Sequence, residues 1–294
     1  MTELIKNLLS GGTVITDGAW GTQLQERGLA LGEFPDLWNV LYPNRVAEVA
    51  RDYVEAGSQI ILTNTFGANR IRLAAYNAEK QVLEINRRGA EISKAAAETR
   101  ARVFASIGPS GKLLPAGEIT PQELRGAFAE QARALREGGA DALVIETMSD
   151  LEEAQLAVRA AVETGLPVVA CMVYDSGKEK DRTMMGHTPE QAAEALTKAG
   201  ADVIGANCGQ GIAGFVSICQ RLRAGTGRPI WIKPNAGLPR VVDGRACYDT
   251  TPQEFASHVP ALIEAGAAFI GGCCGTSPTF IAALAQSIKP RQTN

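Results

Sequence analysis

One pattern of apolar and polar positions recurs along the chain. A stretch with helical periodicity ends in Ala-Gly or a similar pair, and a short apolar run rich in β-branched residues follows. The clearest copies are VEAGSQIILTNTF (54–66), REGGADALVIETM (136–148), TKAGADVIGANC (197–208) and IEAGAAFIGGCC (263–274). The glycine suits the left-handed position after a helix, and the apolar run suits a strand buried on both faces. The pattern therefore predicts helices that alternate with parallel strands.

Weaker copies extend the pattern to eight strand–helix units. Strands are expected near 13–18, 59–65, 102–107, 142–147, 167–173, 202–207, 229–234 and 268–273. Helices are expected near 45–56, 80–100, 121–138, 151–164, 189–199, 212–224, 252–265 and 278–288. Eight such units favour an α/β protein with a single (β/α)₈ TIM barrel domain over residues 1–294. A doubly wound open sheet is the alternative, but no Gly-rich dinucleotide fingerprint follows the first strand.

The longer predicted connections all follow strands, at 19–44, 66–79, 108–120, 174–188 and 235–251. In a barrel these loops lie at the C-terminal face of the strands, where active sites are built. One of them carries Phe34, Trp38 and Tyr42. These aromatic side chains either wall the site or pack the loop onto the barrel rim.

Composition excludes several function classes. The chain is 45% hydrophobic and 21% charged, with a net charge of -3, as in an ordinary globular enzyme. The small negative charge gives no reason to expect a nucleic-acid or anionic membrane partner. No secretory signal and no membrane-spanning apolar run is visible, so we expect a cytoplasmic protein.

Polar and sulfur-containing residues end most of the predicted strands. They are Asp17-Gly18, Asn64-Thr65-Phe66, Gly108-Pro109, Glu146-Thr147, Asn207-Cys208, Pro234-Asn235 and Cys273-Cys274. Carboxylates and thiols at such positions are poor core material, and a barrel brings them to one face. Asp17 and Glu146 have an alternative interpretation as helix caps or salt-bridge partners, and Asn235 could simply open a loop.

Three cysteines form a candidate metal site. Cys208 ends one predicted strand, and Cys273 and Cys274 end the strand two places further along the barrel, about 10 Å away at the rim. Three thiolates leave one tetrahedral position of a zinc ion open, as in a catalytic site. Flanking glycines indicate close approach or unusual dihedral angles rather than packing. A vicinal disulfide between Cys273 and Cys274 is the alternative.

The remaining cysteines carry no such signal. Free cysteine is among the most buried residue types, so packing is the simpler interpretation for Cys171, Cys219 and Cys247. His187 lies just before a predicted helix and is interpreted as a cap-region residue, and His258 lies inside a predicted helix and is interpreted as structural.

Taken together, these motifs resemble the homocysteine S-methyltransferase family, in particular the homocysteine-binding domain of cobalamin-dependent methionine synthase. The resemblance covers nearly the whole chain. It rests on DGAWGT (17–22), ILTNTFGAN (61–69), SIGP (106–109), Glu146, GANC (205–208), KPNAG (233–237) and GGCCGTSP (271–278). The two separated cysteine motifs are the most specific part of this pattern.

The resemblance implies a Zn²⁺ cofactor bound by Cys208, Cys273 and Cys274, which act catalytically through the metal. It implies that homocysteine places its thiolate in the open position, where Asn235 is a possible fourth ligand without substrate. Asp17, Gly18 and Glu146 match positions that hold the amino-acid end of homocysteine. The neighbouring strand-end residues Thr147, Asn207 and Asn235 complete the expected substrate-binding set. The expected reaction is attack of the thiolate on an activated methyl group, giving methionine.

The methyl donor stays open. Betaine-using relatives carry an aromatic cage, and this chain has Gly67 and Thr147 at two of its positions, which disfavours betaine. Two possibilities remain: a small donor such as S-methylmethionine or S-adenosylmethionine, or docking of a separate corrinoid protein or of folate and cobalamin domains. The likeness to the synthase favours docking, and the chain could be a fragment of a longer synthase.

Three alternative functions also stay open. One is a thiol-binding subunit of a multi-protein corrinoid methyl-transfer system. Another is a methyltransferase acting on a different thiol or selenol. The third is a metal-free barrel with a redox-active or buried thiol pair.

Overall fold

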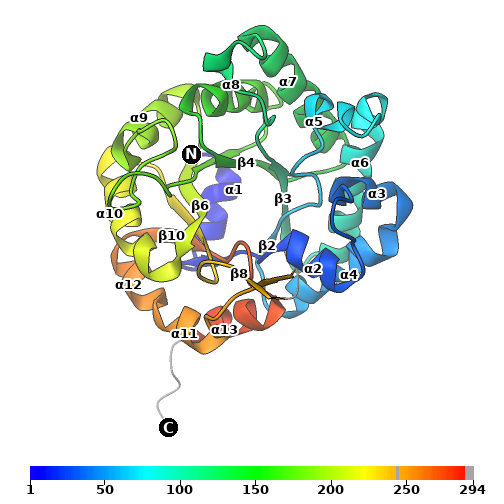
Figure 1. The fold of residues 1–294 in the computed structure, drawn as a ribbon. Helices are drawn as coiled ribbons and strands as arrows, with labels where there is room; N and C mark the ends of the chain where they lie inside the picture. The colour runs from blue at the N-terminus through cyan, green and yellow to red at the C-terminus, as the bar shows by residue number, and fades with distance from the viewer. Residues whose placement is uncertain (243–244, 289–294) are drawn as a thin grey trace.

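The predicted barrel is present in the computed structural model, which describes residues 1–242 and 245–288 (Figure 1). Its eight parallel strands lie in the order β1-β10-β7-β6-β5-β4-β3-β2. A parallel bridge between Thr16 and Ile60 brings the two ends of this order together, so the sheet closes. The strands are β1 Val14–Ile15, β2 Ile60–Ile61, β3 Arg102–Ile107, β4 Ala142–Met148, β5 Val168–Met172, β6 Val203–Gly211, β7 Ile230–Asn235 and β10 Ala267–Ile270.

Helices surround the strands as the helix–strand repeat predicts (Figure 1). Several begin at a Thr-Pro pair: Thr120 and Thr188 each form a capping box, which satisfies amide groups that the first turn leaves unpaired. Within the described ranges, no helix is both long and apolar enough to cross a membrane. The helices are α1 Glu3–Leu9, α2 Trp20–Glu26, α3 Trp38–Leu41, α4 Pro43–Glu55, α5 Arg70–Ala74, α6 Val82–Ala97, α7 Pro121–Glu137, α8 Leu151–Val162, α9 Pro189–Ala199, α10 Phe215–Gly225, α11 Pro252–Ser257, α12 Val259–Glu264 and α13 Pro278–Ile288.

Three expectations about the elements were wrong. The helix expected near 252–265 is two helices, α11 and α12, which meet at His258 because Pro260 has no amide hydrogen for a continuous helix. The last strand ends at Ile270, so the two cysteines after it lie on a loop. The connection expected over 235–251 contains an antiparallel hairpin, β8 (Arg240–Val242) and β9 (Arg245–Cys247). Residues 243–244 of that connection lie outside the described residues.

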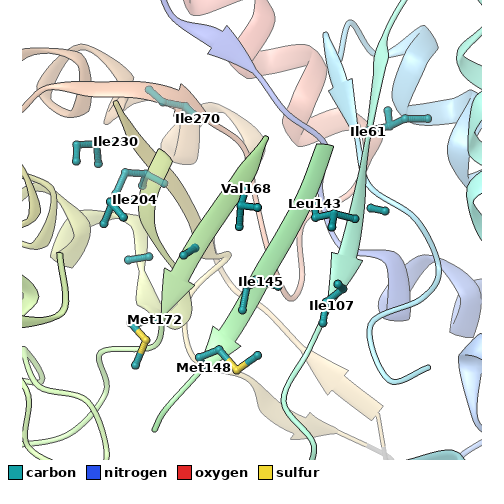
Figure 2. Close-up of a cluster of buried hydrophobic side chains, with 14 of the residues drawn as sticks. Ile61, Ile107, Leu143, Ile145, Met148, Val168, Met172, Ile204, Ile230 and Ile270 are labelled. Carbon is teal, nitrogen blue, oxygen red and sulfur yellow. The ribbon is translucent and has the colours of Figure 1, made fainter. Parts of the chain in front are cut away.

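The core has two layers. Inside the barrel, the Trp231 ring lies between Phe104 and Phe269, with ring centroids 6.0 and 5.3 Å away. Ile5 of α1 joins the same cluster, and α1 is seen through the centre of the ring in Figure 1, so this helix covers the N-terminal end of the barrel. Figure 2 shows hydrophobic side chains of the second layer on the strands, and the same cluster includes buried residues of the outer helices.

Two cysteines have the packing role that the sequence suggests. Cys171 belongs to the barrel interior, and Cys219 is buried between the barrel and the helices. The other candidate site residues lie at the opposite end of the barrel from α1, where the C-terminal ends of the strands meet.

Candidate metal and substrate site

The three cysteines of the two separated motifs meet at the C-terminal face of the barrel. The Cys208 sulfur lies 3.0 Å from that of Cys273 and 3.9 Å from that of Cys274. All three sulfurs lie within 4.8 Å of one another, and each residue is half-buried. Such a group of thiols could hold a metal ion.

Local backbone geometry brings the sulfurs together. Cys208 has a φ of 58°, a left-handed conformation that is uncommon outside glycine, and β6 shifts register against β7 directly after it. This turns the Cys208 side chain away from the regular alternation of the strand. Strained backbone conformations of this kind cluster at functional sites.

The glycines around the cysteine pair are explained by close contacts. A Cβ atom at Gly271 would collide with Thr16, one at Gly272 with Thr276, and one at Gly275 with the ring of Tyr248. Gly275 also has a φ of 81°. The loop after β10 therefore lies tightly against its neighbours and presents both sulfurs to Cys208, which agrees with the expectation of close approach and unusual dihedral angles.

The thiols interact as one unit. Hydrogen bonds from Cys208 and Cys273 lower the pKa of the Cys274 thiol, because two donors stabilise its thiolate. The same shared hydrogen bonds raise the pKa of Cys208 well above its ordinary value. Hydrogen bonding within the cluster thus stabilises a single negative charge, and ionisation of all three sulfurs needs a cation beside them.

Asn207 positions this cluster. Its side-chain oxygen accepts the Thr147 amide at 2.8 Å, and its amide nitrogen contacts the Thr147 hydroxyl at 2.8 Å and the Cys273 sulfur at 3.8 Å. Asn207 is fully buried and does not line the cavity described below. The structure thus ties β4 and β6 to the cysteine loop through one side chain.

Asn235 offers a different kind of atom. Its side-chain nitrogen donates to the Gly209 carbonyl at 3.1 Å, while its Oδ1 is buried and has no hydrogen-bond partner among the described residues. The backbone on either side is bonded to the cysteine loop, by Cys273 N–H to Pro234 and by Ala236 N–H to Cys274. An unpartnered buried oxygen next to a thiol cluster is an unusual arrangement unless it has a further ligand.

Glu146 is a buried carboxylate that lines the same cavity as the three cysteines. It is only 7% exposed, and the hydroxyl of Ser106 donates to it. Burial raises the pKa of Glu146 to about 7, while the charge of Lys233 acts in the opposite direction. Near neutral pH this group is therefore poised between a neutral acid and an anion that attracts a substrate cation.

Asp17 and Lys233 form a buried ion pair, with side-chain exposures of 0% and 2%. One oxygen of Asp17 accepts from the lysine; the other accepts from the Trp20 indole and the Leu62 amide, each at 2.7 Å. Burial alone would lower the pKa of Lys233, but the charges of Asp17 and Glu146 outweigh it and raise that pKa. Sequence reasoning missed Lys233 as a site residue, although a lysine within an apolar strand is itself a signal.

A cavity of about 530 Å³ is lined by the three cysteines together with Glu146 and Lys233. Its size lies within the range of small-molecule sites. The three cysteines, Gly18, Glu146, Thr147, Ser106 and Lys233 line one part of it, and Phe34, Phe66, Arg72 and Tyr76 line another. Of the loop aromatics, Phe34 thus walls the cavity, whereas Trp38 is buried in the core and Tyr42 is exposed.

The structure brings together most of the residues that the sequence suggested. Cys208, Cys273, Cys274, Gly18, Glu146 and Thr147 line one cavity, while Asp17, Asn207 and Asn235 lie behind or beside it. A Cβ atom at Gly18 would lie 2.8 Å from the Tyr53 and Thr276 oxygens, so only glycine fits there. Ser106, Lys233 and Arg72 are site residues that the strand-end pattern did not single out.

Comparisons with known proteins identify the family of the chain. A family model described as homocysteine S-methyltransferase matches residues 14–288. Methionine synthases of Mycobacterium leprae and Mycobacterium tuberculosis are each 32% identical over 98% of this chain, which spans 25% of their length. The metallated form of the homocysteine methyltransferase MmuM from Escherichia coli has a TM-score of 0.80 at 24% identity, covering 96% of this chain and 99% of that one. This last likeness concerns the fold.

Proposed function

The chain belongs to the homocysteine S-methyltransferase family, a family of methyltransferases, and we propose that it is a zinc-dependent enzyme that methylates homocysteine to methionine. The observation that carries this proposal is the convergence of three thiols and one buried carboxylate, Glu146, on a single cavity. The thiols suit a soft metal, and the carboxylate suits the ammonium group of an amino acid.

The donor set fits Zn²⁺. Zn–S bonds of about 2.3 Å in a tetrahedral site would place sulfur ligands about 3.8 Å apart; the Cys208–Cys274 separation is 3.9 Å, whereas the Cys208–Cys273 sulfurs, 3.0 Å apart, would have to separate to hold the ion. The buried Oδ1 of Asn235, which has no protein donor in the described chain, would offer the ion a fourth donor atom in the absence of substrate. When bound, zinc would supply the positive charge that lets a substrate thiol lose its proton near neutral pH.

The protein side chains have distinct roles in this proposal. Glu146, held by Ser106, binds the ammonium group of homocysteine, and Gly18 leaves room for the amino-acid end. Both oxygens of Asp17 already have protein partners, so Asp17 acts through Lys233 and Trp20, which line the cavity. Asn207 and Thr147 hold the cysteine loop in place.

The reaction is a direct methyl transfer. The sulfur of homocysteine forms a bond to the methyl carbon, the bond from that carbon to the donor breaks, and its electron pair leaves with the donor. Positioning of sulfur and methyl group in one cavity supplies much of the rate enhancement. Delivery of the methyl group by a separate corrinoid protein is a second candidate, which the 32% identity to methionine synthases favours.

Metal analysis together with methionine formation tests the proposal. Wild-type protein prepared under reducing conditions should retain about one equivalent of zinc, whereas Cys208→Ala should retain almost none and have no activity. Cys247→Ala is the matched control, because Cys247 is a half-buried cysteine outside the cluster. Zinc-loaded protein is assayed with homocysteine and S-methylmethionine, S-adenosylmethionine, betaine, methylcobalamin or methyltetrahydrofolate. Full activity of Cys208→Ala would refute the ligand assignment.

A further inference from the structure

The cavity has a second end that homocysteine does not account for. Beyond the cysteines and Glu146, it is lined by Phe66, by Phe34 and Tyr76, and by Arg72 of α5. The rings of Phe34 and Tyr76 stack, with centroids 4.5 Å apart, and the Arg72 guanidinium lies 6.0 Å from the centroid of Phe66. An arginine among aromatic rings in a cavity wall is an arrangement suited to a planar or apolar ligand that carries an anion.

Arg72 differs from the arginine two residues before it. Arg70 lies on the same helix but forms a two-pronged ion pair with Glu130 on the surface, away from this cavity. Arg72 forms no ion pair or side-chain hydrogen bond with any of the residues that the structure describes. It is half-buried, and its Nε lies 3.3 Å from the point where a Cβ atom at Gly67 would be.

The two carboxylates at this end have other partners. Asp36 accepts the Gly67 amide at 2.8 Å, which holds the loop after β2, and Glu33 accepts the Ala30 amide at 3.0 Å. Neither forms an ion pair with Arg72 within the described residues. Burial raises the pKa of Asp36 and of Glu153, and the charge of Arg72 lowers both from a longer range. The guanidinium therefore keeps its donors available to a ligand in the cavity.

Homocysteine is too short to use Arg72 while its sulfur lies at the cysteine cluster. Four covalent bonds of about 1.5 Å separate its sulfur from its carboxylate carbon, a reach of at most about 6 Å. Arg72 follows β2, which is two strands from β10 and its cysteine loop, or about 10 Å along the rim before α5 begins. With the homocysteine ammonium on Glu146, the far end stays open for the second substrate.

We infer that Arg72 binds a carboxylate of the methyl donor, whose body lies against Phe34 and Phe66 and whose methyl group points to the cysteine cluster. This inference rests on the proposed methyl transfer and assigns its donor to a chemical class: a small molecule with a carboxylate at one end and a transferable methyl group at the other. A bidentate guanidinium–carboxylate contact fixes the donor's direction as well as its affinity.

Steady-state kinetics of arginine variants test this inference. In zinc-loaded enzyme, Arg72→Met should raise the KM for S-methylmethionine by about tenfold to a hundredfold, the effect of losing a charged hydrogen-bonded contact. The kcat at saturating donor and the KM for homocysteine should stay within about twofold. The KM of Arg72→Lys for S-methylmethionine should lie between those of wild type and Arg72→Met. Arg70→Met, the matched control on the same helix, should have the kinetic constants of wild type.

S-methylmethionine carboxamide, in which a neutral amide replaces the carboxylate, tests whether Arg72 contacts the carboxylate of the donor. Wild type should use the amide with a raised KM, and Arg72→Met should add no further penalty with it. An equal penalty for acid and amide, a shift in the KM for homocysteine instead, or activity with methylcobalamin alone would overturn the assignment of Arg72, while leaving homocysteine methylation intact.

Failure of the proposed function is distinguishable from failure of this inference. If wild type forms no methionine from any donor, calorimetric titration of the zinc- and homocysteine-loaded protein with S-methylmethionine decides the second question. Binding that requires the donor carboxylate and is lost in Arg72→Met would support the subsite, and absence of binding would overturn it.

Discussion

Replacing Asp17 by asparagine should destabilise the folded protein strongly, because it isolates a buried lysine. In wild type, Lys233 is 2% exposed and its ammonium group is paired with Asp17, which itself is fully buried. The second carboxylate oxygen of Asp17 accepts from Trp20 and from the Leu62 amide. Asparagine keeps the shape of the side chain but removes the charge, and it turns an amide group toward at least one existing donor.

The expected loss in free energy of unfolding is about 3 kcal/mol, the lower end of the range for breaking a buried pair. The lower end applies because the charge of Glu146 continues to act on Lys233. Lys233→Met should cost less than Asp17→Asn, since the Asp17 carboxylate keeps its hydrogen bonds from Trp20 and Leu62. The double variant should recover part of the loss, with a coupling of about 1–3 kcal/mol in the cycle.

Urea unfolding followed by tryptophan fluorescence and far-UV circular dichroism measures these values, provided that the two probes give coincident transitions. Asp17→Asn destabilised by less than about 1 kcal/mol, or a double variant whose loss equals the sum of the two single losses, would show that the pair is not energetically coupled. Asp17→Asn that keeps its stability but loses homocysteine affinity would instead support direct contact between Asp17 and substrate.

Three further predictions concern the cavity. Burial raises the pKa of Glu146 to about 7, so protonation removes the charge that binds an ammonium group, and the KM for homocysteine should rise as pH falls through 7. Glu146→Gln should raise this KM above pH 7 to about the value that wild type reaches at low pH, and abolish the pH dependence, as KM profiles would show. Asn235→Ala should speed loss of zinc to a chelator in substrate-free protein but not in the presence of homocysteine; equal rates of loss from wild type and variant without substrate would contradict a ligand role. Gly108→Ala should cost about 1–3 kcal/mol, because its Cβ would lie 2.5 Å from the Phe66 ring, whereas Gly126→Ala on α7 meets no atom within 4 Å and should be neutral or stabilising in urea unfolding.

The barrel and the cysteine cluster at its C-terminal face were predictable because both depend on local signals. Each helix–strand unit repeats one pattern, so the parallel sheet and its C-terminal face follow from periodicity alone. The glycines beside Cys273 and Cys274 indicated close approach or unusual dihedral angles, and the structure places Thr16, Thr276 and Tyr248 against them.

Other parts of the site depend on pairings that no local pattern contains. Asp17 and Lys233 are 216 positions apart, and the lysine directly follows the apolar run Ile230–Ile232 of its strand. Arg72 lies on the short helix α5 inside a stretch expected to be loop, so its direction could not be inferred. The two-residue strands β1 and β2 are shorter than their apolar runs because the ladder, and not hydrophobicity, sets where a strand ends.

The charged groups that line the cavity differ between its two ends. In the proposed zinc-loaded enzyme, a dipositive ion with three cysteine thiolates and a substrate thiolate would carry an excess of negative charge, to which Glu146 adds when ionised, while Lys233 is paired with Asp17. At the other end, Arg72 is accompanied by Glu33 and Asp36, whose carboxylates accept backbone amides. A methyl group attached to a positively charged atom would be drawn to the cysteine end, and transfer to a thiolate would cancel charge as the bond forms, which a site of low dielectric favours. Arg72 at the other end gives the same donor a place for its carboxylate. A donor with a cationic methyl group and a remote carboxylate satisfies both ends, so charge alone orients it with its methyl group toward the sulfur.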